Sequence, residues 1–138
     1  MKAKNEKGAV IVEFAMILPL LVLLLLGIID LSLLLYNNAV LTNASREGCR
    51  VGIVAQDRTN TALIDAQVQT AINNYCQNHL VGFVSNNPVT TVTWPSPTSF
   101  GNPLEVNVTY NYGFLGLSNL SNFKNSLTLG AKTVMLLE

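Results

Sequence analysis

The side chains that could perform chemistry are few and lie far apart along the 138-residue chain. His79 is the only histidine, and it follows a helical pattern, where an exposed or helix-capping role is favoured. No group of His, Cys, Asp and Glu has the spacing of metal ligands, no Ser–His–acid set can be assembled, and no glycine-rich loop follows a strand to hold phosphate. We therefore predict that the protein is not an enzyme and that it has no catalytic residue, no metal and no cofactor.

Cys49 and Cys76 are the two cysteines. In an oxidising compartment they could form a disulfide, and closing a loop of this length would stabilise the fold by about 3.5 kcal/mol. Alternatively, both are small buried residues with free thiols. Spacing alone does not show whether their Cβ atoms meet, so the sequence leaves both alternatives open.

Two acids interrupt the apolar stretch from Lys7 to Tyr36. A carboxylate in hydrocarbon costs about 2.5 kcal/mol or more, so Glu13 needs a partner or water. Taken alone, Glu13 is best explained as an interfacial residue in the first turn of a helix, facing the positive end of the helix dipole. Asp30 lies near the far end of the stretch, where hydration at the interface is favoured over a role as a proton-relay acid.

The element that positions these acids is a long apolar segment. Residues 14–29 carry no charge, and all of them except Pro19 and Gly27 are apolar. As a helix, residues 10–36 would extend roughly 40 Å, which exceeds the hydrocarbon core of a bilayer at about 30 Å. A cleaved secretory signal would have a shorter apolar region and an A-x-A-like site, which this segment lacks. We therefore predict a transmembrane helix over residues 9–36.

The charges that flank this segment predict its orientation. Lys2, Lys4 and Lys7 precede it, whereas the first basic residue after it is Arg46. Positive charge is retained on the cytoplasmic side, so we expect a single pass through a bacterial inner membrane, with residues 37–138 as an extracytoplasmic domain. The net charge of zero gives no support for nucleic-acid binding.

The residues around Glu13 form a further pattern. The sequence K-G-A-V-I-V-E-F resembles the class III signal of type IV prepilins and pseudopilins. This resemblance implies that residues 1–8 are a leader, that a membrane prepilin peptidase cuts after Gly8, and that Ala9 becomes the new N-terminus. Glu13 would then be the fifth residue of the mature chain, followed by the aromatic Phe14, as in the Flp/Tad branch.

A longer stretch is similar to one family within the pilin superfamily. The segments VEFAMILPLLVLLLLGIIDLSLLLY and NASREGCRVG resemble the TadE-like minor pilins, or pseudopilins, of tight-adherence (Tad/Flp) pilus systems. The resemblance covers residues 7–55 and departs from the family at Cys49, where a small residue such as Ala is expected. It implies a minor pilin needed to assemble an adhesion pilus, with other pilins, the inner-membrane assembly platform, the prepilin peptidase and the lipid bilayer as partners.

The spacing of Ala9 and Glu13 is consistent with a role in assembly. Cleavage would expose an α-ammonium on Ala9, and Glu13 would lie about 6 Å further along the helix axis. In a staggered stack of helices, Glu13 of one subunit could approach the ammonium of the next, and misregister would leave both charges unpaired. We therefore expect Glu13 and Phe14 to serve assembly and register. The alternative is a permanently anchored envelope module that binds a peptide or a glycan.

After the apolar segment the helical pattern continues to about Gln56, and it contains small residues on one face. Ala44, Gly48 and Gly52 recur at intervals of four. Glycine inside a helix costs about 1 kcal/mol relative to alanine, which is tolerated where another backbone approaches closely. Packing within the chain is favoured over a subunit contact. Glu47 and Arg50 can pair on the solvated face.

The rest of the chain predicts an α+β fold. Residues 61–80 have the periodicity of a helix, and VTTVTW, LEVNVTYNY and SLTLGAKTVMLL have the pattern of strands. Antiparallel pairing of these strands would form a small sheet that rests on the helices. The aromatic residues could form a ligand-binding patch, although core packing explains them more simply; they are Trp94, Phe100, Tyr110 and Tyr112.

Overall fold

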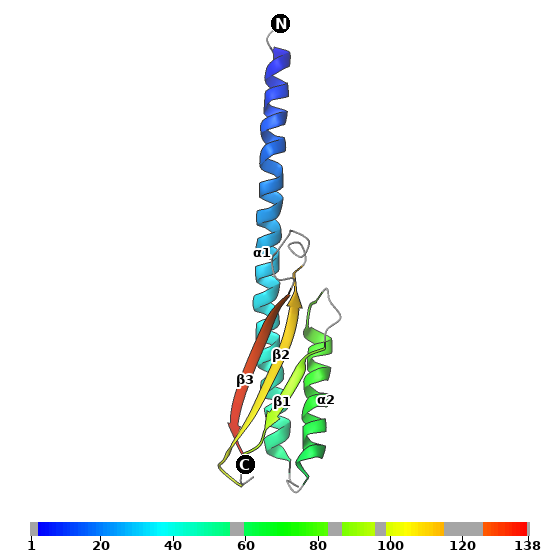
Figure 1. Ribbon diagram of the computed structural model, residues 1–138, viewed down its shortest axis with the longest axis vertical. Coiled ribbons are helices and arrows are strands. Elements are labelled where there is room, and N and C mark those ends of the chain that lie inside the picture. The colour runs from blue at the N-terminus through cyan, green and yellow to red at the C-terminus, as the bar shows by residue number, and fades with distance from the viewer. Residues whose placement is uncertain (1–2, 56–59, 83–86, 96–98, 115–125, 138) are drawn as a thin grey trace.

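A single long helix extends along the molecule. The computed structural model describes residues 3–55, 60–82, 87–95, 99–114 and 126–137, with the backbone alone for residues 3–7. Helix α1 (Ala3–Val54) has 52 residues, and the other elements lie along its C-terminal half (Figure 1). Pro19 lies inside α1, where it removes one backbone donor without ending the helix.

Helix α2 (Thr61–His79) returns alongside the C-terminal half of α1, which confirms the second helix (Figure 1). Asn60 is its N-cap, and the Asn60 side chain accepts a hydrogen bond from the Leu63 amide at 3.4 Å. At the other end, the Leu80 amide donates to the Cys76 carbonyl at 2.8 Å. Both ends are therefore closed by local hydrogen bonds to otherwise unpaired helix groups.

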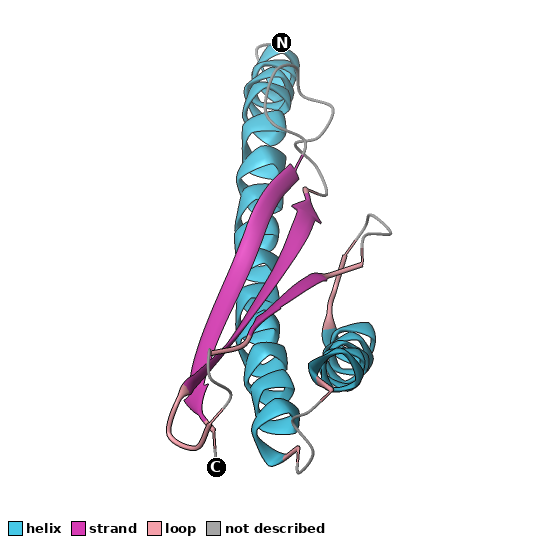
Figure 2. Cartoon of the chain, turned by 60° about the horizontal axis from the view of Figure 1, so that its bottom comes forward, coloured by secondary structure: helices cyan, strands magenta, loops and turns pink. Residues whose placement is uncertain are grey.

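Three strands form one antiparallel sheet in the order β1-β2-β3, with bounds Val89–Thr93, Pro103–Gly113 and Ser126–Leu136. The sheet covers the helices on one side (Figure 2). The α+β fold class is therefore confirmed. Strand β3 continues without interruption through Gly130, which pairs with Thr109. Residues 96–98 and 115–125, in the connections between the strands, lie outside the described residues.

The alternation along β2 orients the sheet. The inward side chains of β2 are all buried, namely Leu104, Val106, Val108, Tyr110 and Tyr112. The intervening residues face outward, and Glu105 there pairs with Lys132 of β3 at 2.7 Å. This alternation confirms the predicted half-buried strand, since successive side chains of a strand point to opposite faces.

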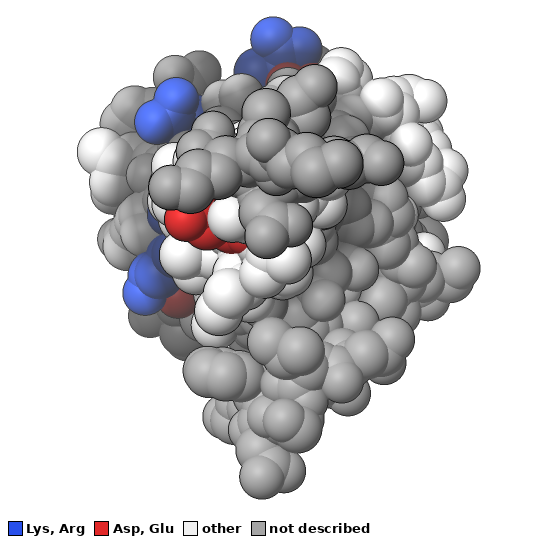
Figure 3. Space-filling model, turned by 90° about the horizontal axis from the view of Figure 1, so that it is seen from above, with Lys and Arg blue, Asp and Glu red and all other residues white. Residues whose placement is uncertain are grey.

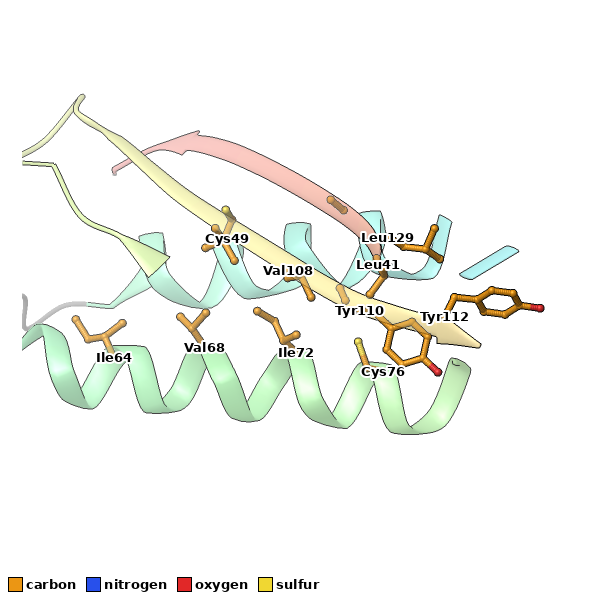
Figure 4. Packing of buried hydrophobic residues seen from close by; sticks show 13 residues of the cluster. Leu41, Cys49, Ile64, Val68, Ile72, Cys76, Val108, Tyr110, Tyr112 and Leu129 are labelled. Carbon is orange, nitrogen blue, oxygen red and sulfur yellow. The ribbon is translucent and has the colours of Figure 1, made fainter. Parts of the chain in front are cut away.

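The core lies between the helices and the inner face of the sheet (Figure 4). Helix α2 contributes one apolar face at helical spacing, made of Ile64, Val68, Ile72 and Cys76. Helix α1 contributes Leu41, Ala44 and Cys49, all of which are fully buried. The buried face of α1 begins at Asp30, which is six residues before the predicted end of the membrane helix at Tyr36.

Candidate membrane and assembly site

The N-terminal half of α1 has no covering element among the described residues. Every described side chain from Gly8 to Leu25 is exposed, and these residues are almost entirely apolar. The segment Gly8–Val54 is the one helix of the described residues that is long and apolar enough to cross a membrane. An apolar helix without a polar face requires lipid or other helices around it, which is consistent with single-pass membrane anchoring.

The residues of the predicted cleavage and register motif all lie on this exposed helix. Ala9 and Glu13 are four positions apart in α1, so their side chains lie on the same face of the helix. Phe14 is exposed. A Cβ atom added at Gly8 would meet no atom within 4 Å, so packing within the chain does not explain the glycine at this position.

The small-residue stripe packs within the chain. A Cβ atom added at Gly48 would lie 2.6 Å from Cδ1 of Ile72, and one added at Gly52 would lie 2.5 Å from Cδ2 of Leu104. Ala44 is fully buried. Gly48 therefore permits the close approach of Ile72 of α2, and Gly52 that of Leu104 of β2, because an added Cβ would require these side chains to shift. This is the favoured alternative, and it uses the stripe inside the domain.

The disulfide between Cys49 and Cys76 is not formed; both residues are free and buried. Cys49 faces the sheet, where its Sγ lies 3.4 Å from the Thr133 carbonyl oxygen and donates to it. Cys76 projects from α2 at a different level, near Tyr110 (Figure 4). A disulfide needs Cβ atoms about 4 Å apart, and the two thiols face different neighbours. Burial raises the pKa of both thiols, that of Cys76 to about 11.

Sequence reasoning missed the environment of Asp30. It is 3% exposed, and its Oδ1 accepts a hydrogen bond from the Tyr112 hydroxyl at 3.4 Å. The favoured hydration of Asp30 at the interface is therefore wrong, because the domain covers this carboxylate. Burial, and secondarily the charge of Asp30, raises the pKa of Tyr112 to about 12, so the phenol keeps its proton to a higher pH than an exposed tyrosine does.

Asn37, directly after Tyr36, is fully buried, although a polar residue at the end of an apolar run usually contacts water. Its side-chain amide binds both backbone groups of Val81, with Nδ2 donating to the carbonyl at 2.6 Å and Oδ1 accepting from the amide at 3.0 Å. Together with the Asp30–Tyr112 contact, this pairing attaches the domain to α1 at its near end, which is the end closest to the N-terminal half of the helix. The only signal in the sequence was that the Asn37 side chain lies on the same face of α1 as the buried residues that follow it.

The aromatic residues do not form a ligand-binding patch. Tyr110 and Tyr112 are in the core, whereas Phe100 is 82% exposed. Trp94 donates from Nε1 to Oδ1 of Asp65 at 2.7 Å, which links the end of β1 to α2. Core packing and one structural hydrogen bond therefore account for three of the four.

The remaining residues that could perform chemistry make contacts within the chain instead. His79 is exposed, its Nδ1 lies 2.8 Å from the Tyr75 carbonyl oxygen, and its ring stacks on that of Tyr75. Glu47 and Arg50 form the predicted i, i+3 pair at 3.5 Å. Within the described part of the chain, no three His, Cys, Asp or Glu residues are placed to hold a metal ion.

Comparison with known proteins adds the family. Residues 8–50 match the model of the family described as TadE-like protein. No curated protein and no solved structure matches the chain. The matched segment contains the Gly8 and Glu13 motif, the exposed half of α1 and the first turns of its buried half. Over residues 8–50, the chain is similar to the TadE-like protein family.

Proposed function

We propose that the protein is a minor pilin or pseudopilin needed to assemble a Tad/Flp-type adhesion pilus, and that a prepilin peptidase removes residues 1–8. The observation that carries this proposal is the coincidence of the TadE-like match, residues 8–50, with the uncovered apolar half of α1. Such a helix is suited first to the inner membrane and then to a bundle of like helices, because both surround it with apolar groups.

In this role the N-terminal half of α1 holds the subunit in the membrane, and the C-terminal half carries the extracytoplasmic domain. The partners are other pilins and the inner-membrane assembly platform. After cleavage, the ammonium of Ala9 and the carboxylate of Glu13 are the charges of the otherwise apolar N-terminal segment. Glu13 and Phe14 are exposed on α1, where they are available to a neighbouring subunit.

Processing is the property that tests this function most directly. When the chain is co-expressed with the cognate peptidase, the intact mass should equal that of a chain beginning at Ala9. Gly8→Leu should block cleavage, because it places a bulky side chain directly before the scissile bond, where the original chain has none. Gly27→Leu is the matched control: it is in the same helix and, like Gly8, has no atom within 4 Å of its added Cβ.

The control variant should be cleaved like the original chain. Retention of residues 1–8 in the presence of an active peptidase would contradict the pilin proposal. That result would favour the permanently anchored binding module, because a chain that keeps its leader has no free ammonium at Ala9.

A further inference from the structure

The two faces of α1 change from apolar to polar at different levels. On the side toward the domain, the buried polar Asp30 marks the first firm contact. On the open side, large apolar side chains remain exposed as far as Leu35 and Tyr36, and Asn38 follows them. Residues 30–36 are therefore covered by the domain on one side and mainly apolar on the other, over about 9 Å of helix. The exception on the open side is Ser32, whose hydroxyl donates to the Ile28 carbonyl.

The length of the helix fixes where this overlap lies relative to a bilayer. Residues 8–29 extend about 33 Å, which matches a hydrocarbon core of about 30 Å. The overlap then begins where the hydrocarbon ends, and its length is close to that of one headgroup layer, about 5–7 Å. If the hydrocarbon instead begins at Glu13, its other edge moves to about residue 33, which places the domain deeper.

The distribution of charge along the domain agrees with this placement. After Asp30, the first charged residue of α1 is Arg46, and the others described are also in the half of the domain far from the N-terminus; they are Glu47, Arg50, Asp65, Glu105 and Lys132. In the segments of the near end, residues 77–82, 110–114 and 126–130, there is no Lys, Arg, Asp or Glu. Seen from the N-terminal end, the Lys, Arg, Asp and Glu side chains in view lie toward the top and the left of the picture (Figure 3).

The near end also presents apolar and aromatic side chains. Leu127, at the start of β3, is 43% exposed, Val81 is 40% exposed, and Tyr36 is 47% exposed. Leu127 pairs with Tyr112 in the sheet, and Val81 is bound by Asn37, so both are held at the level of the overlap. Aromatic and apolar groups of this kind are favoured at the boundary between lipid and water.

We propose that the near end of the domain, where Tyr112 meets Asp30, is seated in the headgroup layer of the bilayer. The domain then does not stand off the membrane on a free stalk of helix. This inference rests on the membrane anchoring in the proposed function, but it does not depend on cleavage or on pilus assembly. The occupant of the surface around Leu127, Val81 and Tyr36 is a lipid surface, because this surface continues directly from the apolar helix.

The test uses the full, uncleaved chain in phosphatidylcholine–phosphatidylglycerol vesicles. Single nitroxide labels are attached to Leu127→Cys, Val81→Cys and, as the distal control, Phe100→Cys. The original chain, treated identically, gives the background from the buried Cys49 and Cys76. Collision of each nitroxide with oxygen, which enters lipid, is compared with collision with a nickel chelate, which stays in water. At Leu127 and Val81 we expect nickel collision several-fold lower, and oxygen collision higher, than at Phe100.

Two further measurements separate the outcomes. A label on Leu21→Cys should report hydrocarbon; if it reports water, membrane anchoring itself is contradicted. If Leu21 is in hydrocarbon but Leu127 and Val81 collide with nickel as often as Phe100 does, only the seating of the domain is overturned. Protection that disappears when the chain is diluted in lipid would indicate a second copy on this surface and would also overturn the proposal.

Discussion

The side chain of Asn37 takes the place of a peptide group for Val81, a residue 44 positions later in the sequence. Its Nδ2 donates to the Val81 carbonyl at 2.6 Å, and its Oδ1 accepts from the Val81 amide at 3.0 Å. The segment that follows α2 is thus bound to α1 by two hydrogen bonds made by one buried side chain. Both backbone groups of Val81 are satisfied, which an irregular segment in a part-buried position requires.

Asn37→Ala should therefore destabilise the domain. Removing the amide leaves the two backbone groups of Val81 without these partners, and we expect the free energy of unfolding to fall by about 1–3 kcal/mol. Urea unfolding of the detergent-solubilised chain, followed by the fluorescence of Trp94, measures this change. Asn38→Ala is the matched control, because Asn38 is exposed on the next position of the same helix. Equal effects of the two substitutions would show that the pairing with Val81 contributes nothing.

The elements could be predicted from the sequence because their patterns are local. The buried alternation of β2 and the apolar face of α2, from Ile64 to Cys76, are both periodicities within one segment. The family resemblance was also carried by a contiguous segment. In each case neighbouring residues contain the whole signal.

The connections between elements could not be predicted in the same way. Asp30 contacts Tyr112, 82 positions away, and Asn37 contacts Val81. Polar residues at the end of an apolar run usually indicate contact with water, and only the position of the sheet and of α2 shows that these two are covered. Whether the two cysteines lie close together could not be predicted either, because two residues on facing helices can lie at different levels along the helix axes.

Gly48→Ala should be destabilising although alanine is the better helix former. The added Cβ would lie 2.6 Å from Cδ1 and 2.8 Å from Cγ1 of Ile72, and overpacking of this kind costs about 1–3 kcal/mol. Gly27→Ala is the control, since its added Cβ meets no atom within 4 Å. The same urea measurement applies to both.

A second substitution identifies the contact responsible. Ile72→Val removes Cδ1 and should by itself cost about 0.5–1.5 kcal/mol. Combined with Gly48→Ala, it should cost less than the sum of the two single changes, because it relieves the overlap. Additive costs would mean that the glycine is not required by the approach of α2.

The stability of the domain should decline in alkaline solution. Burial raises the pKa of the Cys76 thiol from 9.0 to about 11, so the unfolded chain loses this proton at a lower pH than the folded chain does. The free energy of unfolding should therefore be constant below pH 9 and should fall as pH rises through about 11. Urea midpoints measured between pH 7 and pH 10 test this direction.

Cys76→Ala separates the thiol from other groups. This variant should be less stable at neutral pH because of the atoms removed, but its urea midpoint should depend less steeply on pH between pH 9 and pH 10. Tyr112, with a pKa of about 12, contributes mainly above that window. A dependence on pH unchanged by Cys76→Ala would contradict the assignment to this thiol.

Glu13→Val should prevent pilus assembly without preventing membrane insertion. The substitution removes the only charged side chain between Gly8 and Ile29, so insertion should be retained or improved, whereas the ammonium of Ala9 loses its proposed partner. Pili are counted by electron microscopy in a strain that lacks its own copy, and insertion is measured by membrane fractionation.

The control is the double change Val12→Glu and Glu13→Val, which keeps the composition and moves the acid by about 100° around the helix. If register depends on the position of the carboxylate, this control should also fail to assemble. Normal pili in either variant would remove the basis for a register role of Glu13.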